Sequence, residues 1–202
     1  QLETELSWID QNIDGAPYGV DLIVPNTMAN QDESKTGPEL QAMVPQSHRF
    51  FVEETLVKHG IDSSNLYSSS DGGNRGFLGE KSSDKILDIA FSHPIKIIVN
   101  ALGVPPLRML ELAKAKNVAC GALVGNRQQA IKQVESGVDI IISSGTEAGG
   151  HCGEISTMVL VPEVVQALQG FEDVSILAAG GIVTGRQMAA AMAMGADGVW
   201  TG

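Results

Sequence analysis

The chain has 202 residues, 43% hydrophobic and 18% charged, which is enough for one globular domain with a sizeable buried core. Its 13 basic and 24 acidic residues give a formal net charge of −11, and only 4% of its residues are aromatic, so we expect no nucleic-acid surface of cationic and stacking side chains. We expect no membrane association either, because no apolar run reaches about eighteen residues and no signal-peptide pattern begins the chain. Two cysteines, Cys120 and Cys152, cannot form a multi-disulfide framework, which favours the cytoplasm.

Six short apolar runs mark the expected strands. They cover residues 18–24, 95–99, 118–124, 138–142, 174–179 and 196–200. A run without polar alternation is covered on both faces, which is typical of parallel strands in an α/β protein. From the second run onward the starts are roughly 20 to 36 residues apart, the period of a βα unit. The sequence therefore predicts repeated βα units.

Helical patterns lie before the first run and between the later runs. Apolar residues recur at near-helical spacing in residues 2–13, 107–112, 131–134 and 188–194. Pro105 and Pro106 precede the second of these segments, and Thr184 is a candidate N-cap for the last.

Residues 26–94 interrupt this rhythm. The segment is polar near both ends and contains an amphipathic stretch around Phe50 and Phe51. We expect it to be a long excursion within a single domain that spans residues 1–202. Two interpretations stay open: a cover over the carboxyl ends of the strands that shapes a substrate pocket, and a surface insertion without a role.

Six strands are two fewer than a closed (β/α)8 barrel requires. The chain begins in an expected helix and stops at Gly202, directly after an expected strand. Either the sheet is open and doubly wound, or the chain is a (β/α)8 barrel that lacks its first two strands and its C-terminal part. We favour the incomplete barrel.

The densest motif in the chain is residues 143–153, directly after the fourth apolar run, where four glycines surround His151. Such a loop exposes backbone N–H groups at the carboxyl end of a strand, where anionic or planar ligands bind. Gly145 and Gly150 have the spacing of a P-loop, but His151 and Cys152 stand where that motif needs lysine and a hydroxyl residue. The motif therefore predicts a ligand-binding loop that is not a P-loop.

His151 is the best candidate for a catalytic residue, because an imidazole at the end of a strand can exchange protons near neutral pH. His48 and His59 fall on the expected helix of the excursion, and His93 precedes a proline in an expected loop. Cys152 is expected to be a packed free thiol rather than a nucleophile. No second Cys or His accompanies this pair at ligand spacing, so no metal site is predicted.

The last two expected strands both end in glycine. Gly180 and Gly181 follow one, and residues 198–202 close the other with Gly198 and Gly202. Consecutive loops of this kind hold a phosphate on backbone N–H groups after the seventh and eighth strands of a (β/α)8 barrel. Backbone donors would bind a phosphate without lysines, which fits the acidic composition.

These motifs resemble the nitronate monooxygenase (2-nitropropane dioxygenase) family of FMN-dependent (β/α)8 enzymes. The resemblance rests on residues 145–151 (Gly-Thr-Glu-Ala-Gly-Gly-His), 178–182, 198–202, 18–22 and 45–49. It covers nearly the whole chain and implies that strands 3 to 8 of the barrel are present, while strands 1 and 2 and the C-terminal part are absent.

The resemblance also implies a role for each matching residue. His151 would be the catalytic base near N5 of the flavin, and Asp21 and Ser144 would lie beside the isoalloxazine. The remaining residues implied to line the FMN are Gly149, Gly180, Gly181, Trp200, Thr201 and Gly202. Many family members have Asn in place of Asp21 and Gln in place of Ser144.

Three functions remain open. In the first, FMN oxidises an alkyl nitronate with O2 as co-substrate, giving a carbonyl compound and nitrite. In the second, NAD(P)H reduces the flavin and an enoyl thioester or a quinone is the acceptor. In the third, the chain is a non-catalytic FMN-binding fragment. The expected partners are small molecules, and assembly into a homo-oligomer is left open.

Overall fold

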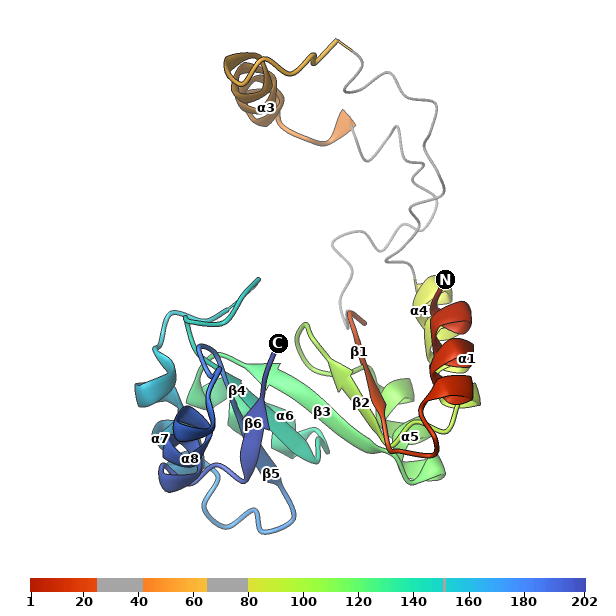
Figure 1. Cartoon of the computed structure of the whole chain (residues 1–202), viewed down its shortest axis with the longest axis vertical. Helices are drawn as coiled ribbons and strands as arrows, with labels where there is room; N and C mark the ends of the chain where they lie inside the picture. The colour runs from red at the N-terminus through yellow and green to blue at the C-terminus, as the bar shows by residue number, and fades with distance from the viewer. Residues whose placement is uncertain (25–41, 65–79, 151) are drawn as a thin grey trace. The chain divides into compact units, whose positions relative to one another are not determined.

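The computed structural model describes residues 1–24, 42–64, 80–150 and 152–202 (Figure 1). The chain divides into two compact units, one made of residues 1–26 and 85–202 and the other of residues 27–84. The first unit contains the sheet and both pockets described below. The second contains helix α3 (Gln46–Lys58).

The first unit is built on a six-stranded sheet in which every neighbouring pair is parallel and the spatial order is the sequence order. The strands are β1 (Gly19–Leu22), β2 (Ile97–Asn100), β3 (Ala119–Val124), β4 (Ile140–Ser144), β5 (Ser175–Ala179) and β6 (Gly198–Trp200). Each begins one or two residues after the start of the apolar run that predicted it, so all six predicted strands are confirmed.

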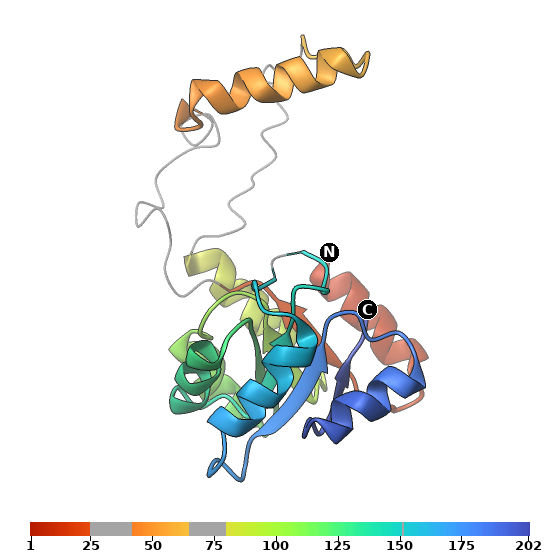
Figure 2. The same ribbon diagram turned by 90° about the vertical axis from the view of Figure 1, so that its left-hand side faces the viewer.

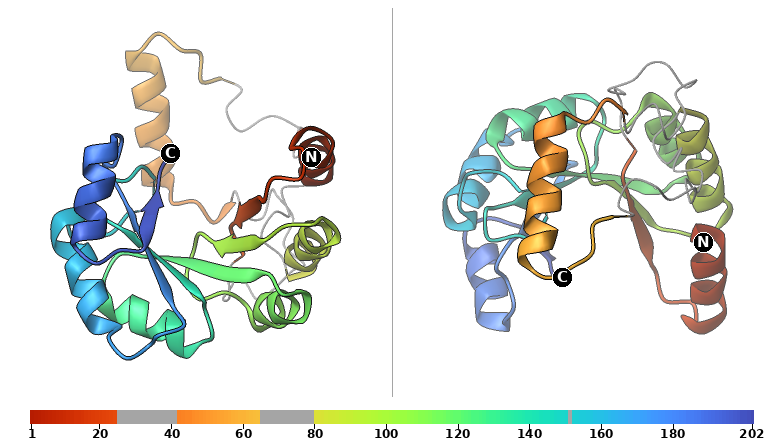
Figure 3. Two further views of the ribbon diagram at one scale, coloured as in Figure 1. Left: turned by 60° about the horizontal axis from the view of Figure 1, so that its bottom comes forward. Right: turned by 90° about the horizontal axis from the view of Figure 1, so that it is seen from above.

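Helices cover the outer face of this sheet (Figures 2 and 3). They are α1 (Leu2–Asn12), α4 (Glu80–Ser92), α5 (Leu107–Lys116), α6 (Arg127–Glu135), α7 (Thr157–Ala167) and α8 (Gly185–Ala193). Leu87 of α4 and Met109 of α5 share one buried cluster with Ile98, and Leu160 of α7 shares a second with Ile141. The apolar residues of each strand that face outward are therefore covered by helices.

The inner face of the sheet carries an apolar cluster of its own, with Val99 and Ala179 among its buried members. In the strand register Asp21 lies beside Val99, while Ser144 and Trp200 flank Ala179. Residues side by side in register project to the same face of a sheet, so these three side chains belong to the inner face. Helices outside, an apolar cluster inside and sequential parallel strands are the construction of a barrel wall. The predicted fold class, an incomplete (β/α)8 barrel, is confirmed.

Helix α3 confirms the predicted helix of the excursion but not a buried apolar face. Phe50 and Phe51 are 59% and 69% exposed, and no described residue of the helix is buried. No described helix is both long enough and apolar enough to cross a membrane.

Candidate active site

A pocket of about 630 Å³ lies at the carboxyl ends of the strands, and we call it the glycine pocket. Its lining includes all eight residues that the sequence predicted for the cofactor: Asp21, Ser144, Gly149, Gly180, Gly181, Trp200, Thr201 and Gly202. Strands at opposite edges of the sheet, β1 and β6, contribute to this one pocket, which requires the sheet to curl. The roles of the eight residues stay predictions, and His151 lies outside the described residues.

The loop after β5 presents unpaired backbone donors at this pocket. Among the described residues, no acceptor partners the N–H groups of Gly180, Gly181 or Ile182. Gly180 and Gly181 have φ of +104° and +68°, in the left-handed region that favours glycine. Successive N–H groups in such a turn form an anion-binding concavity. The loop therefore fits a phosphate group.

The charges at the glycine pocket are acidic, because its described lining holds two carboxylates and no lysine or arginine. Partial withdrawal from water raises the pKa of Asp21. At Glu147 the hydrogen bond from the Thr157 backbone N–H, with a further bond from its hydroxyl, lowers the pKa. A phosphate at this site would thus depend on backbone donors rather than on cationic side chains.

Glu147 fastens the loop after β4 to the beginning of α7. Its Oε2 accepts hydrogen bonds from the backbone N and the Oγ1 of Thr157, both at 2.9 Å. Ser156, the N-cap residue of α7, makes no capping bond with its side chain. The carboxylate of Glu147 therefore satisfies a helix N–H group that would otherwise lack a partner. Sequence analysis did not single out Glu147 or Thr157, because a cap supplied from ten residues away leaves no N-cap signature.

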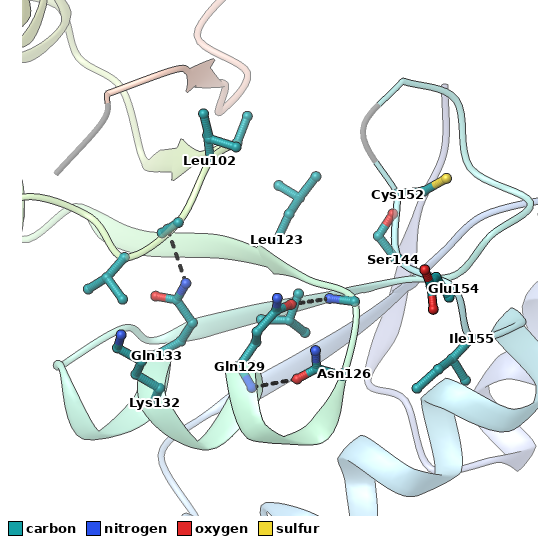
Figure 4. A pocket seen from close by; sticks show the side chains of 16 residues that line it. Leu102, Leu123, Asn126, Gln129, Lys132, Gln133, Ser144, Cys152, Glu154 and Ile155 are labelled. Atoms are coloured by element: carbon teal, nitrogen blue, oxygen red, sulfur yellow. Dashed lines mark hydrogen bonds between the residues drawn. The ribbon is translucent and has the colours of Figure 1, made fainter. Parts of the chain in front are cut away.

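A second pocket of about 580 Å³ adjoins the first, since both are lined by Leu123 and Ser144 (Figure 4). We call it the amide pocket, because Asn126, Gln129 and Gln133 line it together with Lys132. Asn126 Oδ1 accepts from the backbone N of Gln129 at 2.8 Å, and Gln129 Oε1 accepts from the N of Gly125 at 2.7 Å. Gln133 donates to the carbonyl of Gly103 at 3.0 Å. Sequence analysis missed this pocket, because its polar residues form an ordinary helix surface pattern.

Asn100, at the end of β2, is fully buried and joins two chain segments. Its Oδ1 accepts from the backbone N of Val24 at 2.9 Å, and its Nδ2 contacts the carbonyls of Leu102 and Gly103 at 3.0 and 3.2 Å. Those two residues line the amide pocket. Asn100 thus fixes the loop after β2 against the end of β1.

The two cysteines differ in their surroundings. Cys120 is buried in β3, as the sequence predicted, and burial raises its pKa to about 12. Cys152 was predicted to be packed, and this was wrong: its thiol is free and exposed, with Sγ 3.7 Å from the carbonyl of Thr146. Cys152 lines the amide pocket instead of packing into the core. Within the described ranges, no group of three or more His, Cys, Asp or Glu side chains could hold a metal ion.

His93 belongs to a polar cluster at the opposite end of the sheet, before the start of β2. Its Nδ1 lies 2.6 Å from Asp10 Oδ2 and its Nε2 lies 3.4 Å from Glu3 Oε2. The hydroxyl of Tyr18 donates to the other oxygen of Asp10. The hydrogen bond to Asp10 raises the pKa of His93. This cluster joins α1 to the sheet and lies away from both pockets.

Comparison with known proteins places the whole chain in one group. A family model described as nitronate monooxygenase matches residues 1–202. Rv1533 of Mycobacterium tuberculosis, which is named a monooxygenase, is 44% identical over 205 residues that cover 100% of this chain and 53% of that protein. A Staphylococcus saprophyticus protein named a nitronate monooxygenase is 27% identical over 214 residues, with the same two coverages. The chain spans about half the length of the curated relatives it matches.

Solved structures share the fold. FabK from Thermotoga maritima has a TM-score of 0.63 at 21% identity, covering 100% of this chain and 47% of that one. A nitroalkane oxidase from Streptomyces ansochromogenes has a TM-score of 0.64 at 23% identity, covering 96% and 53%.

Proposed function

The chain belongs to the nitronate monooxygenase family, and from this premise we propose that it supplies the FMN site of an enzyme that oxidises alkyl nitronates. The observation that supports this proposal best is the glycine pocket. It brings residues of β1, β4, β5 and β6 together at the carboxyl ends of the strands, where (β/α) barrels bind substrates and phosphates.

The residues of the pocket fit the parts of FMN. The unpaired N–H groups of Gly180 and Gly181 suit its phosphate, and the side chain of Trp200 offers an apolar surface on the inner face. Asp21 and Ser144 are assigned to the isoalloxazine. When bound, FMN would supply a two-electron acceptor, and O2 would return it to its oxidised form.

His151 is assigned the proton transfer. A neutral nitroalkane must lose the proton on the carbon beside its nitro group, and His151 would accept that proton as a general base. A nitronate is the anion that results from this loss and needs no base. The products of the whole reaction would be a carbonyl compound and nitrite.

The decisive experiment is an absorbance spectrum of the intact protein, followed by anaerobic addition of a nitronate and, separately, of NADH. Bleaching of the flavin by the nitronate alone supports nitronate oxidation. Bleaching by NADH alone supports the NAD(P)H-dependent reductase, for which the adjoining amide pocket offers room for a second ligand. A bound flavin that neither donor bleaches supports a non-catalytic module.

The role of His151 is tested separately with His151→Asn. A general base contributes about 10²- to 10⁴-fold, so turnover of neutral nitroalkanes should fall by a comparable factor. Oxidation of preformed nitronates should change much less. Equal losses with both substrates would contradict the assignment.

A further inference from the structure

Thr157, the first residue of α7, lies where two loops meet. It is 6% exposed, and its Oγ1 is 3.0 Å from the carbonyl oxygen of Gly180 and 3.3 Å from that of Ala179. The same atom is 2.9 Å from Oε2 of Glu147, in the loop after β4. One buried hydroxyl therefore contacts the loop after β4 and two successive peptide groups at the end of β5.

These contacts fix the direction of the donors in the glycine loop. In a trans peptide the C=O and the following N–H point in opposite directions, and no cis peptide occurs in the described chain. Because the carbonyls of Ala179 and Gly180 both turn toward Thr157, the N–H groups of Gly180 and Gly181 both turn away from it. The carbonyl of Ala179 is held further by the backbone N of Gly145, at 3.1 Å.

Close packing around Thr157 leaves this arrangement little freedom. A Cβ added to Gly145 would lie 2.3 Å from Thr157 Oγ1, and one added to Gly180 would lie 2.8 Å from it. A Cβ on Gly181 would lie 3.0 Å from the Cβ of Glu147. Glu147 in turn holds the backbone N of Thr157 at 2.9 Å. The loops after β4 and β5 therefore both pack closely against the hydroxyl of Thr157.

We propose that Thr157, held in place by Glu147, is a positioning residue that aims the N–H groups of Gly180 and Gly181 at the cofactor phosphate. This inference rests on the proposed FMN site, and it assigns a function to a residue that lines neither pocket. The hydroxyl has one proton, which it shares between Oε2 of Glu147 and the carbonyl oxygens of Gly180 and Ala179. Without this shared proton no donor stands between the Glu147 carboxylate and the Gly180 carbonyl, and the Gly180–Gly181 peptide is free to rotate its N–H out of the pocket.

The test compares FMN with riboflavin, which carries the same ring system but no phosphate. Dissociation constants are measured by flavin fluorescence for the intact wild-type protein, Thr157→Val and Thr157→Ser. In Thr157→Val the N–H of Gly181 should lose its hydrogen bond to the charged phosphate. This loss should weaken FMN binding about 10- to 100-fold. Riboflavin affinity should not change, and Thr157→Ser should restore FMN binding because it keeps the hydroxyl.

Ser156→Ala is the matched control, because it removes the neighbouring hydroxyl, which makes no capping bond. If Thr157→Val does not fold, Thr157→Ala gives the same comparison without added atoms. Equal losses for FMN and riboflavin, or an unchanged FMN affinity, would overturn the inference while the proposed function stands. A wild-type protein that binds neither flavin would refute the proposed function, and this inference with it.

Discussion

Replacing Gly180 by alanine puts a methyl group where the folded chain has no room for one. The new Cβ would lie 2.8 Å from Thr157 Oγ1, 3.1 Å from the N of Ala148 and 3.2 Å from the O of Gly145. The backbone at this position has a φ of +104°, which side chains rarely adopt. Left-handed backbone costs about 1–2 kcal/mol, and overpacking costs about 1–3 kcal/mol more.

The expected loss in the free energy of unfolding is therefore about 2–5 kcal/mol, which lowers the Tm by roughly 4 to 20 °C for a chain of this size. Gly185→Ala is the matched control. Its Cβ would meet nothing within 4 Å, and Gly185 begins α8 without a left-handed φ. Alanine suits a helix better than glycine, so this variant should be as stable as the wild type or slightly more stable.

The free energy of unfolding of both variants is measured by urea denaturation, with tryptophan fluorescence as the signal. Trp200 packs against the inner apolar cluster and reports on the sheet, whereas Trp8 is 63% exposed and contributes a nearly constant signal. Compared with the wild type, Gly180→Ala should lose more affinity for FMN than for riboflavin. A Gly180→Ala protein as stable as the wild type, or equal destabilisation by Gly185→Ala, would refute this reading of the loop.

Three further predictions concern other parts of the first unit. Asn100→Asp keeps the acceptor for the backbone N–H of Val24 but places a carboxylate oxygen against the carbonyls of Leu102 and Gly103. The free energy of unfolding, measured by urea denaturation at pH 7, should fall by about 2–4 kcal/mol, and the loss should shrink in acid, where the new carboxyl is protonated. The hydrogen bond to Asp10 raises the pKa of His93, so the charged imidazole stabilises the fold fully below its ordinary pKa of about 6.5. This stabilisation is lost as the pH rises through the raised pKa. A plot of Tm against pH should show the fall in the wild type and not in His93→Gln. A thiol reagent near pH 8 should label Cys152 in the folded protein and Cys120 only after unfolding, and rapid labelling of both would contradict the burial of Cys120.

Local patterns were sufficient for most of the secondary structure. The strands were predictable because parallel strands covered on both faces are continuous apolar runs, and α8 because apolar residues at helical spacing follow Thr184, a candidate N-cap. Helix α4 was not predicted, because it falls in the segment 26–94 that was interpreted as an excursion. Helix α7 was not predicted either. Pro162 lies inside it, and its apolar residues around Leu160 form a run that resembles a strand.

The residues that line the glycine pocket were predicted from sequence motifs rather than from geometry. The glycine loops are visible in the sequence because left-handed backbone at Gly180 and Gly181 leaves a residue-type signature. Asp21 entered the prediction only through the family resemblance, since a lone acidic residue in a strand indicates no ligand. Its inner-face position follows from its register with Val99, which depends on strand pairing.

The sequence by itself determined the order of the strands and the places where the backbone must turn on glycine, because these depend on residues close together in the chain. Only the tertiary structure decided which atoms meet across loops. Asn100 bonds to Val24, 76 residues away, and Thr157 contacts the carbonyl of Gly180, 23 residues away. Such contacts are set by the register and curl of the whole sheet, so no local pattern of apolar or polar residues encodes them.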